Sequence, residues 1–252
     1  LTYVRDAYQL FPEYRTSRSL KSRLASAAFR PMIRALRAVS TRLATPTEGL
    51  ARAIGVPDAA LLPPGAPAPV DVARAPGADA LLFVGDARLP AHGADRLIRA
   101  VGMARERGVA VTLTVVCRPG QEPPGHRPDW LEIRRAEGNE IHALLPQVLA
   151  TVIPRPRGPY NNLALPIKLF DYLSYGRPLL VTECAEQARV VRDADAGVVT
   201  GADPRELADA IARLVSAGGA QLDRWSANAR RAATEASWAD RATRILELLG
   251  RR

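Results

Sequence analysis

The segment from Leu165 to Val181, LPIKLFDYLSYGRPLLV, carries side chains suited to holding a phosphate and a sugar together. Pro166 fits the first turn of a helix, because proline lacks the N–H that would be unpaired there. Lys168 and Asp171 stand three residues apart and therefore share one face near the positive end of that helix. A helix N-terminus with a cation and a carboxylate could bind a phosphate and a sugar hydroxyl.

Turn residues in the same segment define the elements that follow. Gly176 ends the predicted helix, and Pro178 prevents it from continuing. The run Leu179 to Thr182 is short, apolar and bounded by turns, which predicts a buried parallel strand. The segment thus predicts a helix that presents its first turn next to a sheet.

The polar residues of this helix also have structural interpretations. Lysines are common on exposed helix faces, so Lys168 alone is weak evidence for a ligand. Its place in the first turn favours binding of a phosphate. Asp171 could bind a ribose hydroxyl, or it could form an ion pair with Lys168 or Arg177.

The loop before this helix, RPRGPYNNLA at residues 155–164, offers further candidates. It contains guanidinium groups, a Gly-Pro turn and two adjacent amides, Asn161 and Asn162. Amides and the N–H groups of a helix end suit the non-bridging oxygens of a diphosphate. The alternative is a polar surface turn without a ligand.

Gly85 and Arg88 follow an apolar run, residues 80–85, that predicts another buried strand. A glycine allows a phosphate to approach the backbone closely. Arg88 could neutralise phosphate charge, or it could be a solvated loop arginine. Gly85 stands alone, without a GxGxxG pattern, so it indicates phosphate binding only together with the other candidates.

Two glutamates, Glu183 and Glu186, follow the predicted strand at residues 179–182. Because the carboxyl ends of parallel strands form the ligand edge of a sheet, both are expected near that edge. One of them could contact a sugar hydroxyl. The alternative is that either glutamate caps the short helix that follows.

The remaining composition argues against several classes of protein. Cys117 and Cys184 are far apart, and His92, His126 and His142 are scattered, so neither a disulfide framework nor a metal site is predicted. There is no nucleophile turn and no GxxxxGK[ST] motif. No apolar run reaches the roughly 18 residues of a membrane span, and no signal peptide opens the chain. A cytoplasmic location is expected.

Positive charge is concentrated near the N-terminus of a chain whose net charge is +9. Through Arg52 there are ten Lys and Arg residues against three acids. Such a segment could attract an anionic membrane surface or a phosphorylated substrate. The alternative is a solvated basic helix in an arginine-rich chain. Nucleic-acid binding is not expected, because no recognised module or interleaved aromatic residues accompany the charge.

Composition divides the chain into four parts. Residues 1–62 contain basic helices, residues 63–78 form a hinge rich in Pro and Gly, residues 79–236 alternate strands with helices, and residues 237–252 form a closing helix. The alternation predicts an α/β fold with a Rossmann-like, doubly wound parallel sheet. The chain opens on the apolar LTYV, which predicts that it continues an upstream sequence.

The individual elements follow from apolar periodicity and from turn residues. The predicted strands cover residues 41–44, 80–85, 109–116, 131–134, 149–153, 179–182 and 197–199. The predicted helices cover residues 17–39, 47–54, 94–107, 139–145, 166–176, 203–217, 221–236 and 238–249, and a short helix after residue 183 runs toward residue 191. Thr47 and Asn139 are the predicted caps of the helices that begin with them.

In their order and spacing, these segments resemble the retaining, two-domain (GT-B) glycosyltransferases often called group 1 or family 4. The resemblance covers nearly all of residues 40–250. It rests on TPTEGLARAIGV with LLPPGAP, on FVGD, on PIKLFDYLSYGRPLLV, on residues 188–215 and on SWADRATRILELL. It implies that residues 1–62 are the last part of an acceptor domain and residues 79–236 a donor domain, so that the chain holds a donor site without a complete active site.

The resemblance also implies roles for particular residues. Asp171 takes the place of the acidic residue that holds the donor ribose, usually the second of two glutamates separated by seven residues; the first falls on Leu163. The family's basic pair after the first donor-domain strand is matched in part by Arg88, and Lys168 could supply the missing charge. Glu186 stands where the family often has a glutamate near the sugar.

The implied reaction moves a sugar, with retention, from a UDP- or GDP-linked donor to an acceptor hydroxyl, without a cofactor or metal. Surface polysaccharide or glycolipid assembly is the implied setting, with a saccharide or lipid-linked acceptor. Fixed cations and a helix N-terminus would stabilise the leaving diphosphate. Two alternatives remain: a nucleotide-sugar-binding subunit that needs a partner chain, and a sugar-nucleotide epimerase, for which the histidines are poorly placed.

Overall fold

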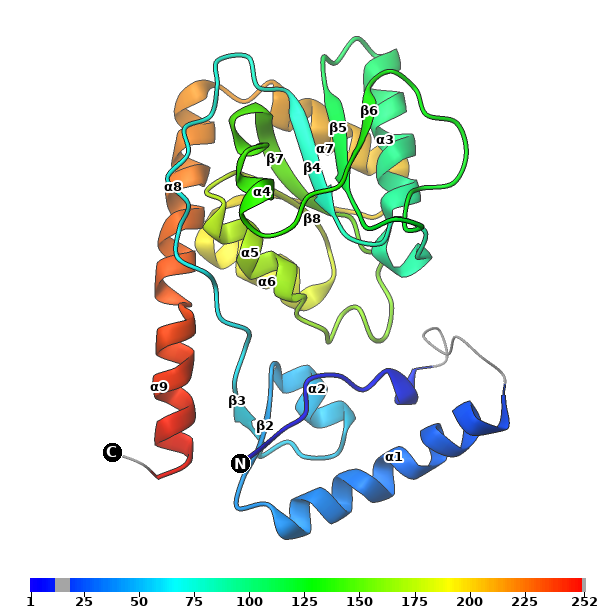
Figure 1. The fold of residues 1–252 in the computed structure, drawn as a ribbon, viewed down its shortest axis with the longest axis vertical. Coiled ribbons are helices and arrows are strands. Elements are labelled where there is room, and N and C mark those ends of the chain that lie inside the picture. Colours follow the sequence, from blue (N-terminus) through cyan, green and yellow to red (C-terminus); the bar gives the residue numbers. More distant parts are fainter. Residues whose placement is uncertain (12–18, 251–252) are drawn as a thin grey trace.

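The computed structural model describes residues 1–11 and 19–250 and contains two lobes of unequal size (Figure 1). The larger lobe is built on one parallel sheet with the strand order β6-β5-β4-β7-β8-β9. Its strands are β4 (Ala80–Val84), β5 (Thr112–Val116), β6 (Leu131–Arg134), β7 (Val148–Ile153), β8 (Leu179–Thr182) and β9 (Gly197–Thr200). The predicted α/β fold with a doubly wound parallel sheet is confirmed.

Helices cover both faces of this sheet, which explains why its strands are almost continuously apolar. One face packs against α3 (Ala94–Glu106) and α7 (Pro204–Val215). The other face packs against α4 (Asn139–His142), α5 (Ile167–Ser174), α6 (Ala185–Ala194) and α8 (Gly219–Glu235). Short 3₁₀ turns at Pro90–His92 (η3) and Leu145–Gln147 (η4) complete the connections.

The smaller lobe is a three-stranded parallel sheet that two helices accompany (Figure 1). Its elements are β1 (Thr2–Tyr3), a 3₁₀ turn at Tyr8–Leu10 (η1), α1 (Leu20–Val39), β2 (Leu43–Thr45), α2 (Glu48–Ala53) and β3 (Ala60–Leu61). Phe29 and Ile33 of α1 pack against Leu50 of α2 in a small separate core. Thr47 caps α2 as predicted, because its hydroxyl accepts a hydrogen bond from the Leu50 N–H at 3.1 Å.

Two segments of the chain run between the lobes. The Pro-rich stretch 63–78 is irregular, as its composition predicts, but it lies along the larger lobe, where Val70 N–H donates to Ser174 O at 2.7 Å. The C-terminal helix α9 (Trp238–Leu248) continues from α8 toward the smaller lobe (Figure 1). There Arg241 donates to Leu62 O at 3.0 Å and lies over the Tyr3 ring. The two lobes are therefore connected along one whole edge.

Several sequence expectations about element ends are wrong. Gly138, not Asn139, caps α4, and that helix stops at His142 because Pro146 opens a separate 3₁₀ turn. Pro166 adopts an extended conformation as the cap of α5, which begins one residue later than predicted. Strands β1 and β3 were not predicted, since two residues carry no periodicity. Residues 17 and 18 of the first predicted helix lie outside the described residues.

Arg177 is a buried cation held by backbone carbonyls. Its side chain is 1% exposed and donates to Leu145 O at 2.8 Å, to Val148 O at 3.1 Å and to Val72 O at 3.1 Å. Within residues 1–11 and 19–250 no carboxylate pairs with it, so the suggested ion pair with Asp171 is not formed. Burial lowers the pKa of Arg177 to about 10, which leaves it protonated at neutral pH. It fastens the irregular stretch to the end of the sheet.

We expect Arg177→Leu to lower the free energy of unfolding by at least about 3 kcal/mol, because it leaves several buried carbonyls without donors. Urea unfolding followed by circular dichroism measures this change. Arg118→Leu is the matched control: Arg118 forms an exposed ion pair with Glu137, and its loss should cost less than about 1 kcal/mol. Equal costs for the two variants would contradict the anchoring role.

Candidate functional site

The connections of the sheet diverge between β4 and β7, its two central strands. From β4 the chain proceeds to β5 and β6 on one side, and from β7 it proceeds to β8 and β9 on the other. In open α/β sheets ligands bind in the crevice at the carboxyl ends of two such strands. Gly85 and Pro154 occupy those ends here. The crevice between them is the candidate site.

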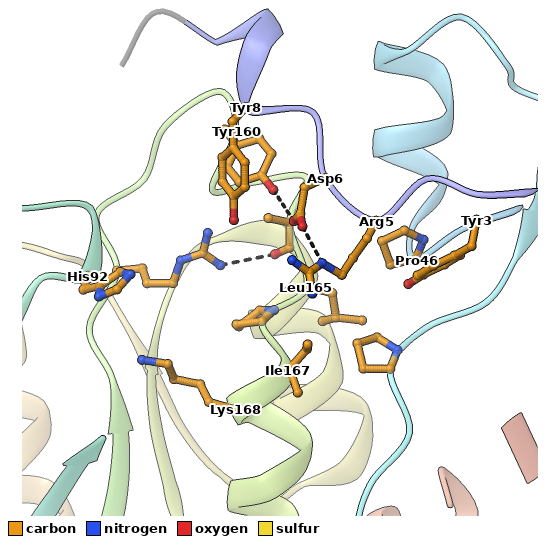
Figure 2. A pocket seen from close by; sticks show the side chains of 14 residues that line it. Tyr3, Arg5, Asp6, Tyr8, Pro46, His92, Tyr160, Leu165, Ile167 and Lys168 are labelled. Atoms are coloured by element: carbon orange, nitrogen blue, oxygen red, sulfur yellow. Dashed lines mark hydrogen bonds and ion pairs between the residues drawn. The ribbon is translucent and has the colours of Figure 1, made fainter. Parts of the chain in front are cut away.

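Two cavities open at this edge of the sheet. The interlobe cavity, of about 280 Å³, is lined by Tyr3, Arg5, Asp6, Tyr8, Pro46, Pro64, His92, Arg155, Tyr160, Ala164, Leu165, Pro166, Ile167 and Lys168 (Figure 2). The sheet-end cavity, of about 520 Å³, is lined by Val84, Gly85, Val116, Cys117, Arg118, Pro119, Gln121, Arg135, Ala136, Glu137, Gly138 and Ile141. Gly85 of the second cavity and Lys168 of the first stand in contact, so the two cavities are neighbours.

Lys168 reaches from the first turn of α5 to the end of β4. Its ammonium donates a hydrogen bond to Val84 O at 2.7 Å and lies 4.9 Å from the centre of the Phe83 ring. Among the described residues no carboxylate forms an ion pair with it. Burial, reinforced by the nearby Arg155 guanidinium, lowers the pKa of Lys168 to about 8. The site therefore holds a buried cation without an ion-pair partner among the described residues, and the nearby Asp171 carboxylate offsets the lowering of its pKa only in part.

Gly85 allows this approach. Its φ is +140°. Glycine adopts this backbone conformation readily, whereas the backbone of a residue with a side chain would be strained in it. A Cβ at this position would stand 2.8 Å from the Lys168 ammonium nitrogen. Glycine is therefore required for the ammonium to rest against the end of β4. The structure thus brings together two residues predicted separately from the sequence.

His92 belongs to this cluster, although its scattered place in the sequence suggested no role. Its Nδ1 donates a hydrogen bond to Asp86 O at 2.8 Å, since a carbonyl oxygen can only accept. Its ring lines the interlobe cavity on the same side as Lys168 (Figure 2). Gly93, with φ +76°, packs directly on the Pro154 carbonyl and holds this turn against the end of β7. A usable sequence signal was that His92 lies in the loop after β4, directly before a helix.

Arg155, the first charged residue of the loop after β7, is the second cation of the cluster. It is buried, donates to Ala164 O at 3.3 Å and also donates to the Asn161 side-chain oxygen. Asn161 in turn donates to Pro156 O at 2.8 Å and is itself 4% exposed. Asn161 is thus a brace that orients Arg155, which differs from the expectation that it faces a diphosphate.

Three other predicted residues are placed away from the two cavities. Arg88 is bound to its own neighbour, the Asp86 carboxylate, at 2.9 Å, and this bond lowers the pKa of Asp86. Asn162 has a buried side-chain oxygen without a hydrogen-bond partner among the described residues. Glu186 pairs with Arg189 at 3.0 Å in the first turn of α6. None of the three lines either cavity in the part of the chain that the structure describes.

Asp171 follows Lys168 by three residues on α5, as predicted. Burial raises the pKa of its carboxyl, although the Lys168 charge opposes that rise. No hydrogen bond or ion pair joins this carboxylate to another residue in 1–11 or 19–250. Glu183, by contrast, is exposed and lies 3.8 Å from Arg157 and 3.7 Å from Arg192 at the rim. Asp171 lines neither cavity, but its carboxylate has no partner among the described residues and lies near the Lys168 ammonium.

The loop between β7 and α5 also docks into the smaller lobe (Figure 2). The Tyr160 hydroxyl donates to the Asp6 carboxylate at 2.8 Å, and its ring centre lies 4.7 Å from that of Tyr8. The Thr47 hydroxyl donates to Leu163 O at 2.7 Å. Sequence reasoning missed these contacts, because they join residues more than a hundred positions apart. They fix the loop that leads into the Lys168 helix.

Comparison with known proteins decides the family. The family model described as "Glycosyl transferases group 1" matches residues 78–217, which is more than half of the chain. This chain belongs to the group 1 glycosyl transferases. The resemblance deduced from the sequence is confirmed. No curated protein shows significant sequence similarity to the chain.

Solved structures of glycosyltransferases share the fold of this group 1 chain. Sucrose-phosphate synthase from Thermosynechococcus elongatus superposes with a TM-score of 0.71 at 16% identity, over 98% of this chain and 66% of that one. A glycosyltransferase from Rickettsia africae ESF-5 gives 0.70 at 9% identity, over 98% and 76%. WaaG, a glycosyltransferase involved in lipopolysaccharide biosynthesis, gives 0.62 at 18% identity, over 88% and 65%.

These similarities show that the chain has the GT-B fold, and their coverage shows how much of each glycosyltransferase structure the chain matches. The chain spans 66% of the length of sucrose-phosphate synthase and 47% of that of TarM, another structure with the same fold. The chain thus spans only part of the length of these glycosyltransferase structures.

We expect Gly85→Ala to lower the free energy of unfolding by about 1–3 kcal/mol, because it strains the backbone and displaces the Lys168 ammonium. Urea unfolding measures the change. Gly158→Ala is the control, since Gly158 has an ordinary φ and open space around its Cα. A Gly85→Ala variant as stable as Gly158→Ala would show that the ammonium does not rest where the structure places it.

Proposed function

We propose that this group 1 glycosyl transferase binds a nucleoside diphosphate sugar and transfers the sugar, with retention, to an acceptor hydroxyl. The observation that carries the proposal is the buried Lys168 ammonium, which forms no ion pair with a described residue and lies next to Gly85 at the crevice where β4 and β7 diverge. A buried cation without an ion-pair partner is costly, and a bound phosphate lowers that cost. A saccharide or a lipid-linked saccharide is the proposed acceptor.

The proposed donor extends across both cavities. Its diphosphate lies against Lys168 and Gly85, within reach of Arg155, and the ribose is held by the free Asp171 carboxylate. The base occupies the sheet-end cavity, and the sugar lies toward the interlobe cavity. The pneumococcal O-GlcNAc transferase GtfA, whose structure contains UDP and GlcNAc, superposes with a TM-score of 0.66 at 12% identity. A UDP- or GDP-linked donor is consistent with the combined size of the cavities.

The proposed chemistry depends on charge that grows during the reaction. As the bond between the anomeric carbon and the diphosphate oxygen breaks, its electron pair leaves with the diphosphate. A fixed ammonium therefore stabilises the transition state more than the bound donor, which is what raises a rate. Lys168 can do this because a pKa of about 8 leaves it mostly protonated at neutral pH. The proposal includes no cofactor or metal.

Calorimetric titration with UDP-glucose, GDP-mannose and related nucleotide sugars tests donor binding. At least one is expected to bind, and Lys168→Met and Asp171→Asn should each weaken it by roughly 1.5–3 kcal/mol, about ten- to a hundredfold in Kd. Glu183→Gln is the matched control, because Glu183 lies exposed at the rim outside both cavities. Failure of every nucleotide sugar to bind, or unchanged affinity in both variants, would refute the proposed function.

We further propose that the chain works at an anionic membrane surface, on the inner face. Helix α1, which forms the edge of the smaller lobe farthest from the large sheet, exposes Leu20, Leu24 and Val39 (Figure 1). Residues 19–42 contain six basic residues and no acidic one. A helix that exposes leucines beside arginines suits the boundary of anionic lipid headgroups. Among the described helices, none is long and apolar enough to cross a bilayer.

Flotation with vesicles tests this surface. We expect the chain to float with vesicles that contain phosphatidylglycerol more than with pure phosphatidylcholine, and we expect salt to weaken the binding. The double variant Arg30→Glu/Arg34→Glu should lose most of the bound fraction. Arg205→Glu/Arg213→Glu on α7 makes the same charge change on another lobe and should bind like the native chain. Equal flotation with both kinds of vesicle would contradict the proposal.

A further inference from the structure

His92 has one ring nitrogen engaged and one available. Nδ1 carries the proton that it donates to Asp86 O at 2.8 Å, so in the neutral ring Nε2 bears a lone pair. No hydrogen bond joins Nε2 to any residue that the structure describes. The ring lines the interlobe cavity together with Lys168 (Figure 2). The position of His92 is fixed by its turn, because Gly93 packs on the backbone of Pro154.

Three charged residues near His92 affect the pKa of its ring. Lys168 on α5 and Arg155 in the loop after β7 are positive, and together with burial they lower the pKa of His92. Asp86, in the same loop as His92, opposes this effect, but its carboxylate is already bound to Arg88. Burial first, and then the two neighbouring cations, thus favour the neutral ring while the cavity is empty.

Charges on the far wall of the cavity do not change this balance. Arg5 and Asp6 of the smaller lobe also line the interlobe cavity, and they pair with each other. Asp6 accepts a further hydrogen bond from the Tyr160 hydroxyl. Their charges therefore cancel locally. An anion that enters near Lys168 is the one change that would reverse the field at His92.

We propose that His92 takes up a proton when the diphosphate of the donor binds, and that its Nε2–H then donates a hydrogen bond to a phosphate oxygen. This inference rests on the proposed function, because it requires a diphosphate next to Lys168. The proton comes from solvent, and no covalent bond forms at His92. When the sugar leaves, the electron pair of the broken C–O bond stays on the diphosphate, and the imidazolium stabilises that added charge as a third cation beside Lys168 and Arg155.

The sign of the pH dependence follows. Bound donor raises the pKa of His92 from its lowered value, so affinity is highest below the pKa of the free protein and falls as pH rises through the pKa of the complex. Each unit by which the donor raises that pKa corresponds to about tenfold tighter binding at low pH. The diphosphate of a nucleotide sugar is fully ionised throughout this range, so the ligand itself contributes no proton. Lys168 contributes little near pH 7, because its pKa is about 8.

Proton uptake is measured by calorimetric titration of the nucleotide sugar that binds most tightly in the panel above. The titration is made at pH 6.5–7 in two buffers of different ionisation enthalpy. The native chain is expected to take up a substantial fraction of one proton. His92→Asn can keep a donor to Asp86 O but lacks Nε2, so its uptake should fall to the small contribution of Lys168. His126→Asn, a change of an exposed histidine outside both cavities, should leave uptake unchanged.

A second variant separates the charge of His92 from the fold. His92→Arg should bind without this uptake and should bind more tightly than the native chain at pH 8, because a guanidinium remains charged there. Donor binding without proton uptake by the native chain, or with equal uptake by His92→Asn, would overturn the inference and leave the proposed function intact. If no nucleotide sugar bound at all, both would be overturned.

Discussion

The hydrogen bond from the Lys168 ammonium to Val84 O, at 2.7 Å, is the interaction on which the candidate site depends. An ammonium withdrawn from water without an ion-pair partner is unfavourable, and here burial lowers its pKa to about 8. The fold tolerates it because the first turn of α5, the end of β4 and Gly85 converge at one point of the sheet. The crevice therefore has a fixed positive electrostatic potential, which favours the binding of a phosphate.

The rest of the molecule keeps that crevice in shape. The loop after β7 is braced internally by Asn161 and is docked on the smaller lobe through Tyr160 and Thr47. The Pro-rich stretch is fastened by Arg177, and α9 spans both lobes through Arg241. A displacement of the smaller lobe would therefore be transmitted to the loop that leads into α5. In this way the smaller lobe is mechanically linked to the candidate site.

Sequence reasoning predicted the local features well, because they are encoded locally. Buried parallel strands appear as short apolar runs, Thr47 as a cap and Gly176 as a helix end, and spacing alone puts Lys168 and Asp171 on one face. The partners of side chains could not be predicted in this way, because they depend on tertiary packing. Arg88 binds Asp86, Asn161 binds Arg155, and His92 reaches the site only through the turn at Gly93.

The central claim is that Lys168 is a buried cation that binds an anionic ligand. The small number of lysines in the sequence allows a direct test. Lys21 and Lys168 are the only lysines in the sequence, so ¹³Cε-lysine NMR gives two signals, and the exposed Lys21 serves as an internal reference. The account predicts that the Lys168 signal titrates with a pKa of about 8 in the free chain and that a bound nucleotide sugar raises this pKa. A Lys168 signal that titrates near 10.5, the ordinary value for lysine, and does not respond to nucleotide sugars would contradict it.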